Sequence, residues 1–301
     1  MIPLPENMPG WMLGSALILA FFLGASIFSF YLASASRVLY FFYGPARKQL
    51  SYWNRWKEFF SRRSFCDDCE TPIRPAHVIP VLGYFLARRH CPACGAEIPA
   101  MHPILESLGG LLLIYFLVAS QDLALSLLAL LFCGHMLIAI ATDWNLYSLD
   151  YENTILAALV ALLFLLRKSF IADLWPAQEW DLLKQNVSLM TDYLDSTGLL
   201  LHFLASSIWA GPLVTALGAL LLTLPLHFWK PEGLGLGDVW LLMPLALFLG
   251  MPYILLPIIL GSGWSVIHIV LVAKDRAAPA PLGAFMAAGA MLAVTVQFYY
   301  F

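Results

Sequence analysis

The chain has 301 residues, of which 61% are hydrophobic and only 12% are charged. About a quarter of the residues in a soluble domain are charged, so this composition excludes a soluble globular protein and predicts a polytopic membrane protein. The formal net charge of −3 argues against nucleic acid as a partner, and the partner implied by the composition is the lipid bilayer.

Eight apolar runs are predicted to be membrane-spanning helices, so the expected fold is an all-α polytopic membrane protein. The sixth run is short, because a full crossing needs about 20 residues, and we expect it to be broken or partly recessed, with the preceding G-L-G-L-G segment continuing it. The runs cover residues 11–35, 104–120, 123–142, 152–167, 206–229, 239–250, 252–273 and 281–300.

Basic residues predict the orientation in the membrane. Ten of the sixteen Lys and Arg residues lie between Arg37 and Arg89, which predicts that this segment is cytoplasmic. Alternation of the spans then places 143–151, 230–238 and 274–280 on the same side. The stretch from Arg167 to Ser206 is expected to be extracytoplasmic, either as an amphipathic interfacial helix or as an ordinary packed loop.

Four of the five cysteines form two C-x-x-C pairs in the polar segment that follows the first span. Cys66 and Cys69 are separated by twenty-one residues from Cys91 and Cys94, a spacing typical of a tetrathiolate zinc site. Zinc is favoured over two disulfides because a cytoplasmic segment is kept reduced. The site is expected to be structural, since four sulfur ligands leave no open position for water. Cys133 lies alone in an apolar run and is expected to be a small core residue.

Two aspartates lie at the edges of apolar runs, where a carboxylate is costly. Asp143 ends the third run, and Asp238 follows the G-L-G-L-G segment. Two carboxylates in one low-dielectric site share a proton, as in aspartic proteases, so the pair predicts peptide hydrolysis that needs no serine, cysteine or catalytic metal. Two alternatives stay open: Asp238 as a cap of the next helix, and a transporter that uses both acids for proton coupling.

Several other residues are candidates for supporting roles. Asp150 lies two helical turns after Asp143 and would share its face in a continuous helix, although a cap of the fourth span is favoured. Glu106 is expected to be a supporting partner of the acids or a cap. Gly235 and Gly237 would let an extended peptide approach the backbone closely. His135 and His268 lie within spans, and each is expected to be neutral and hydrogen-bonded to a neighbouring helix.

Four segments together resemble one family. Arg74 to Glu106 is similar to N-I-P-V-L-S-W-L-x-x-R-G-x-C-x-x-C-G-x-x-I-x-x-x-Y-P-x-V-E, and Asp143 to Asp150 resembles D-x6-D. Gly235 to Val239 resembles G-x-G-D-V, and Pro281 to Gly289 resembles P-F-G-P-F-L-A-x-G. These motifs, in this order, are those of the bacterial type IV prepilin peptidases, which are G-x-G-D membrane aspartic proteases.

The resemblance implies that Asp143 and Asp238 are catalytic. The expected substrate is a type IV prepilin or a type II secretion pseudopilin, whose basic leader is removed on the cytoplasmic side of the inner membrane, typically after glycine and before phenylalanine. Many members also N-methylate the new N-terminus with S-adenosylmethionine. The chain departs from the family pattern at three positions. Leu32 stands where the family has asparagine, Leu149 where it has proline, and Trp240, two residues after Asp238, where it has lysine.

The expected organisation has three parts. Residues 1–36 form the first transmembrane helix, 37–102 a small cytoplasmic zinc domain with four cysteine ligands, and 103–301 a membrane peptidase domain with an extracytoplasmic insertion at 168–205. The alternatives are a peptidase without methyltransferase activity, a proton-coupled transporter, and a zinc-bearing assembly scaffold. A transporter should show an internal repeat of broken helices, and the sequence shows none.

Overall fold

The computed structural model describes residues 9–44, 46–66, 68–172, 208–229, 234–273 and 280–299. Within these ranges the regular elements are all helices, and the only extended pairings are two isolated bridges. The chain divides into two compact units, Pro3–Val118 and a second unit that contains Ala119–Phe301. Each unit is described by itself.

The first unit begins with the long apolar helix α1, Gly10–Val38, which continues as the π-helical turn η1, Leu39–Tyr43. The unit also contains most of α5, whose small residues let α1 approach closely. A Cβ on Gly24 would meet the backbone of Gly109, and a Cβ on Gly110 would meet Phe21, as in transmembrane helix pairs that pack through small residues. The other elements of the unit are α2 (Ala46–Gln49), α3 (Tyr52–Ser61), η2 (Pro75–Val78), α4 (Leu82–Leu86) and α5 (Met101–Ser120).

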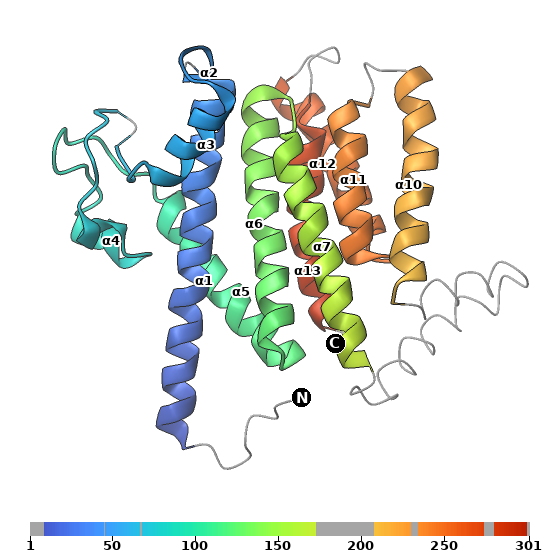
Figure 1. Cartoon of the computed structure of the whole chain (residues 1–301), viewed down its shortest axis with the longest axis horizontal. Helices are drawn as coiled ribbons and strands as arrows, with labels where there is room; N and C mark the ends of the chain where they lie inside the picture. The colour runs from blue at the N-terminus through green and yellow to red at the C-terminus, as the bar shows by residue number, and fades with distance from the viewer. Residues whose placement is uncertain are drawn as a thin grey trace, which may run out of the picture. The chain divides into compact units, whose positions relative to one another are not determined.

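In its described residues, the second unit is a bundle of six helices (Figure 1). Helix α6 packs against α7 and α13, α11 packs against α7, α10 and α13, and α12 packs against α13. The bounds are α6 Leu123–Leu146, α7 Tyr151–Ala172, α10 Ala210–Trp229, α11 Leu236–Leu249, α12 Leu255–Ile267 with the π-helical η3 His268–Ala273, and α13 Leu282–Tyr299.

Four phenylalanines from four helices meet in the core of this bundle. Phe248 of α11 stacks on Phe132 of α6 and on Phe164 of α7, with ring centroids 4.1 and 4.2 Å apart, and Phe298 of α13 lies 6.1 Å from Phe164. All four side chains are fully buried. Because lipid is as apolar as these side chains, packing rather than the hydrophobic effect holds membrane helices together, and this cluster fixes α6, α11 and α13 against one another.

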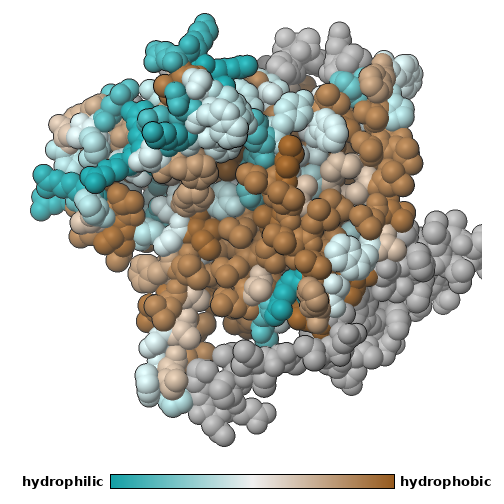
Figure 2. Space-filling model, in the orientation of Figure 1, coloured by the Kyte–Doolittle hydropathy of each residue, from teal (hydrophilic) through white to brown (hydrophobic). Residues whose placement is uncertain are grey.

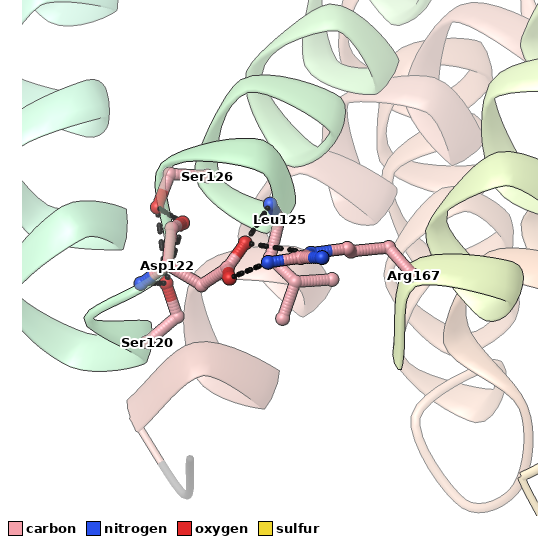
Figure 3. A network of polar contacts seen from close by, with 5 residues as sticks. All are labelled: Ser120, Asp122, Leu125, Ser126 and Arg167. Carbon is pink, nitrogen blue, oxygen red and sulfur yellow. Dashed lines mark hydrogen bonds and ion pairs between the residues drawn. The ribbon is translucent and has the colours of Figure 1, made fainter. Parts of the chain in front are cut away.

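A polar network closes the N-terminal end of α6 (Figure 3). The Asp122 carboxylate accepts the Leu125 amide at 2.8 Å, which is a side-chain cap, and it also pairs with Arg167 near the end of α7. The hydroxyls of Ser120 and Ser126 lie 3.0 Å apart beside it. The network joins the first turn of α6 to the last turns of α7.

The helices fit the expected spans. Six are long and apolar enough to cross a membrane, and two shorter apolar helices, Leu236–Leu249 and Leu255–Leu271, bring the number in the described residues to eight. On the face shown in Figure 2, apolar side chains dominate over the helical region. The all-helical membrane fold is therefore confirmed. The sixth span is short, as expected, and carries Pro244 inside it. Most of the insertion expected at 168–205 lies outside the described residues.

Candidate active site and metal site

Asp143 lies in the last turn of α6, because that helix runs to Leu146, four residues beyond the predicted end of the span. Its side chain is 6% exposed. The Ala284 amide, in the first turn of α13, donates a 2.8 Å hydrogen bond to Asp143 Oδ2. A helix N-terminus with free amides favours a negative group, so α13 supports a carboxylate at this position.

Asp238 lies in the first turn of α11 and is half-buried. The N-cap of that helix is Gly235, and no side chain makes a capping hydrogen bond. The alternative that Asp238 supports the start of this helix stays open, because its carboxylate lies in the first turn and interacts with the backbone of Gly235. Gly237 lies inside the helix, whereas Leu234 and Gly235 precede it as non-helical residues.

The two acids meet at Gly283, the second residue of α13. A Cβ added to Gly283 would lie 3.0 Å from Asp238 Oδ1 and 3.2 Å from Asp143 Oδ2. The carboxylates, ninety-five residues apart in sequence, therefore face the same small space, and a residue without a side chain keeps that space open. The C-terminal end of α6 and the N-terminal ends of α11 and α13 come together here.

Leu149 forms one wall of this space. It is 3% exposed, and it lies in the short connection between α6 and α7. A Cβ on Gly237 would lie 3.3 Å from Leu149 Cβ, and a Cβ on Gly283 would lie 2.9 Å from its Cδ1. The glycines are required because this leucine packs directly against the backbone of both α11 and α13.

Asp150 is separate from this meeting point. The helix α6 ends before it, so Asp143 and Asp150 do not share a helical face. Its Oδ2 accepts the Asn153 amide at 2.8 Å, so it caps α7, the interpretation that the sequence favours. Asn153 also pairs with His135 of α6 through two contacts, Nδ1 to Oδ1 at 2.8 Å and Nδ2 to the His135 carbonyl at 3.0 Å.

The two intramembrane histidines differ. His135 is hydrogen-bonded to the neighbouring helix α7, as expected. Within the part of the chain that the structure describes, His268 Nδ1 has no hydrogen-bond partner. Its ring lies 5.8 Å from those of Trp144 and Phe285, the residues next to Asp143 and to Ala284. An aromatic group therefore lies beside the acids.

Glu106 belongs to the first unit, where it holds a loop. Its Oε2 accepts the Val81 amide at 2.6 Å. Val81 has φ +63°, and the Leu82 amide donates to the Pro80 carbonyl across it, which forms a strained γ-turn for a β-branched residue. Glu106 is therefore a side-chain partner of this loop rather than a helix cap, and its expected role beside the acids stays a prediction.

The four predicted cysteines form one cluster. Their sulfurs all lie within 4.8 Å of one another, with Cys66 to Cys94 and Cys69 to Cys91 both at 3.9 Å. A tetrahedral zinc site with Zn–S bonds of about 2.3 Å has sulfurs about 3.8 Å apart, so these residues fit the metal. Thr71, whose hydroxyl oxygen lies 3.3 Å from Cys69 Sγ, lowers the pKa of that thiol to about 6.

The two cysteine loops are closed by matching backbone hydrogen bonds. In the first, the Glu70 amide donates to the Cys66 carbonyl, and in the second the Gly95 amide donates to the Cys91 carbonyl. Glu70 and Gly95 both have positive φ, +55° and +77°, and each loop is flanked by one isolated bridge. Because the two loops place their four thiols within 4.8 Å of one another, they can hold a metal ion.

Sequence reasoning missed three parts of the acid site: Gly283, the Ala284 amide and Leu149. The segment from Pro281 to Gly289 is singled out by its resemblance, but without a role. Only the folded chain shows that Gly283 of this segment lies between the two acids.

The fold and these sites define a class: a polytopic helical membrane protein with two carboxylates, one buried and one half-buried, facing one space at one end of its bundle, and with a four-cysteine cluster. Residues 22–120 match the family model of the bacterial peptidase A24 N-terminal domain. This match covers the N-terminal part of the chain and supports the prepilin peptidase family and a peptidase. No curated protein and no solved structure matched it.

Proposed function

We propose that the chain is an aspartic endopeptidase of the inner membrane that removes the basic leader of a type IV prepilin or a type II secretion pseudopilin on the cytoplasmic side. Asp143 and Asp238 are its catalytic pair. The observation that carries the proposal is that both carboxylates face the space at Gly283. The family supports a prepilin-type substrate.

The chemistry follows from two acids that share one proton, because like charges this close oppose each other's ionisation. The ionised carboxylate takes a proton from water, which attacks the scissile carbonyl. The protonated carboxylate donates its proton to the carbonyl oxygen, and the proton that the other carboxylate took from water then passes to the leaving amine. The Ala284 amide on Asp143 Oδ2 favours the ionised form of Asp143, which assigns it the role of base and assigns Asp238 the role of acid.

The open backbone around the acids suits an extended peptide. Gly235 and Gly283 offer no side chain on the approach to the acids, and any Cβ at Gly283 would lie against both carboxylates. We propose Gly235 and Gly237 as supporting residues, because they let the substrate backbone and Leu149 approach α11. We also propose Asp150 as an indirect support of the site, through the start of α7.

Zinc is the proposed metal of the cysteine cluster. Cys66, Cys69, Cys91 and Cys94 would be its ligands, and it would stabilise the segment between α3 and α5 without taking part in hydrolysis.

N-methylation of the new N-terminus with S-adenosylmethionine is the further activity that the family resemblance implies, and it stays a prediction. It requires a second site, because proton-sharing carboxylates do not orient a methyl donor against an amine; that needs proximity of two bound reactants. An Asp143→Asn variant should therefore still methylate a pilin that has already been cleaved.

The test is to incubate the purified protein with a prepilin, with and without S-adenosylmethionine, and to weigh the products by mass spectrometry. Leader loss in both samples supports the peptidase, and an added methyl group only in the second supports the methyltransferase. No cleavage at all would favour the transporter or the scaffold.

A further inference from the structure

Helix α3 follows the end of α1 and packs one of its faces against it. Ser51 caps α3 through the Asn54 amide, at 3.4 Å. On the packed face, Trp56 and the buried Phe59 lie against Phe42 of η1, with centroid distances of 4.7 and 6.3 Å. This aromatic contact holds α3 on the continuation of α1.

Arg37 fixes the other end of α3. Its guanidinium donates to the carbonyls of Phe59 and Arg62, each at 2.6 Å. The last carbonyls of a helix lack partners within it, and a cation there complements the helix dipole. Because Arg37 lies in the last turn of α1, near the C-terminal end of the apolar stretch Gly10–Tyr43, α3 is held beside the end of that stretch.

The face of α3 that adjoins this packed face is exposed and carries a pattern of its own, with Phe60 stacked on Trp56 where the two faces meet. Trp53 is 79% exposed and Phe60 68% exposed, and Lys57 lies between them and is also exposed. Positions i, i+4 and i+7 share one face of a helix, so the three form a stripe of two aromatic rings flanking one amine.

The segment that carries this stripe is strongly basic. Between Ala46 and Arg63, six basic residues stand against the single acid Glu58. Two of the six are engaged within the unit: Arg55 lies over Phe42, and Arg62 lies 3.9 Å from the centroid of Phe65 and pairs with Glu70. The other four are exposed: Arg47, Lys48, Lys57 and Arg63.

We propose that this face of α3 lies in the interface of the bilayer and binds anionic lipid headgroups. Exposed tryptophan and phenylalanine favour the interfacial region, and lysine reaches from it to the headgroups. Basic side chains near an anionic membrane surface are attracted to it. The basic segment that carries this face does not fit a basic peptide leader, and its continuity with α1 favours the membrane over an acidic soluble partner.

The experiment measures hydrogen exchange of the α3 amides in the full chain. The protein is placed in nanodiscs of phosphatidylcholine alone or mixed with phosphatidylglycerol. We expect exchange over Tyr52–Ser61 to be about tenfold slower with the anionic lipid, and the difference to shrink as salt screens the charges. Equal exchange in the two lipids would overturn the proposal and would turn the search toward an acidic protein partner.

Two variants and two controls make the result specific. Lys57→Glu should abolish most of the lipid dependence, and Trp53→Ser should speed α3 exchange in both lipids, whereas Trp53→Phe should restore protection. Arg88→Glu makes the same charge change at an exposed position after α4 and should leave the lipid dependence intact. A lipid dependence that survives Lys57→Glu, or that Arg88→Glu removes equally, contradicts the proposal.

Discussion

Gly283 is the residue at which the acid site is most sensitive to a single methyl group. In a Gly283→Ala variant the new Cβ would lie within 3.2 Å of an oxygen of each acid and 2.9 Å from Leu149, so it would fill the space that water and the scissile carbonyl need. We expect leader cleavage to fall at least about a hundredfold, since small misplacements at a reacting centre cost this much. Initial rates on a prepilin would measure it.

The matched control is Gly218→Ala in α10, where a new Cβ would have nothing within 4 Å. Alanine there should raise helix stability by a few tenths to about 1 kcal/mol and leave cleavage unchanged. If Gly283→Ala cleaves as well as this control, the space at Gly283 is not where the reaction occurs.

Glu106 has a separate, measurable role in the first unit. Its carboxylate accepts the Val81 amide at 2.6 Å, and hydrogen bonds to charged groups contribute about 1.5–3 kcal/mol. Glu106→Ala should therefore release the strained turn and speed exchange of the Val81 amide by tenfold or more. Glu97→Ala, at an exposed acid of the same unit, is the control. Unchanged exchange of the Val81 amide in Glu106→Ala would show that the hydrogen bond to Glu106 does not stabilise the turn.

At the scale of elements, the network of Figure 3 predicts how α6 responds to acid. Burial opposes the charge on Asp122, but Arg167 and the Leu125 amide outweigh it and hold the pKa of that carboxyl below its usual value. A lowered folded-state pKa contributes stability above the unfolded value, about 3.9, and this stability is lost as the pH falls through the folded value.

The variant that isolates this contribution is Asp122→Asn, which keeps a capping oxygen but loses the ion pair. We expect it to lower the free energy of unfolding by up to about 1 kcal/mol at neutral pH, and the gap from wild type to close as the pH falls below about 4. Thermal unfolding in detergent across pH would measure this. A gap that stays constant down to about pH 2 would mean that the ion pair does not set the acid response.

The cysteine loops make a second prediction at this scale. Because zinc binding is folding energy for such a segment, Cys91→Ser should lose the metal and lose hydrogen-exchange protection over 64–98 before the helices unfold. Cys133→Ala changes the one cysteine that is buried outside the cluster and should keep one zinc per chain. Metal analysis of both proteins decides the point, and a fully folded wild type without metal would contradict it.

At the scale of the molecule, the sequence predicts the helices and the cysteine cluster better than it predicts how the helices pack to bring the two acids together. The eight helices follow from apolar runs, and the cysteine cluster follows from the spacing of two C-x-x-C pairs, because both signals are local. The contact of Asp143 and Asp238 at Gly283 depends on how α6, α11 and α13 pack, and packing has no periodic signature. The same reason explains why the sequence leaves Asp150 open to two interpretations, of which the hydrogen bond from the Asn153 amide supports the helix cap.

Helix ends were the least predictable feature. The polar residues after Asp143 suggest that the span stops there, yet α6 continues to Leu146, where Tyr147 adopts a left-handed conformation and its amide bonds to the Asp143 carbonyl. Tertiary contacts of the last turn, including the Ala284 amide on Asp143, extend the helix. As a result the acid lies inside a rigid element rather than in a loop.

The central claim is that Asp143 and Asp238 act together as the proteolytic pair. The most direct measurement is cleavage of a prepilin by purified Asp143→Asn, Asp238→Asn and Asp150→Asn variants in detergent, with thermal unfolding as a check on folding. Asparagine keeps the size of aspartate but cannot carry the shared proton. At Asp150 it keeps an oxygen to cap α7, so this variant is the matched control.

We predict that Asp143→Asn and Asp238→Asn are folded and lose cleavage by at least about four orders of magnitude, as when a catalytic group is removed from a proteolytic unit, and that Asp150→Asn retains most of it. Leader removal at an appreciable rate by either folded dyad variant would contradict the account.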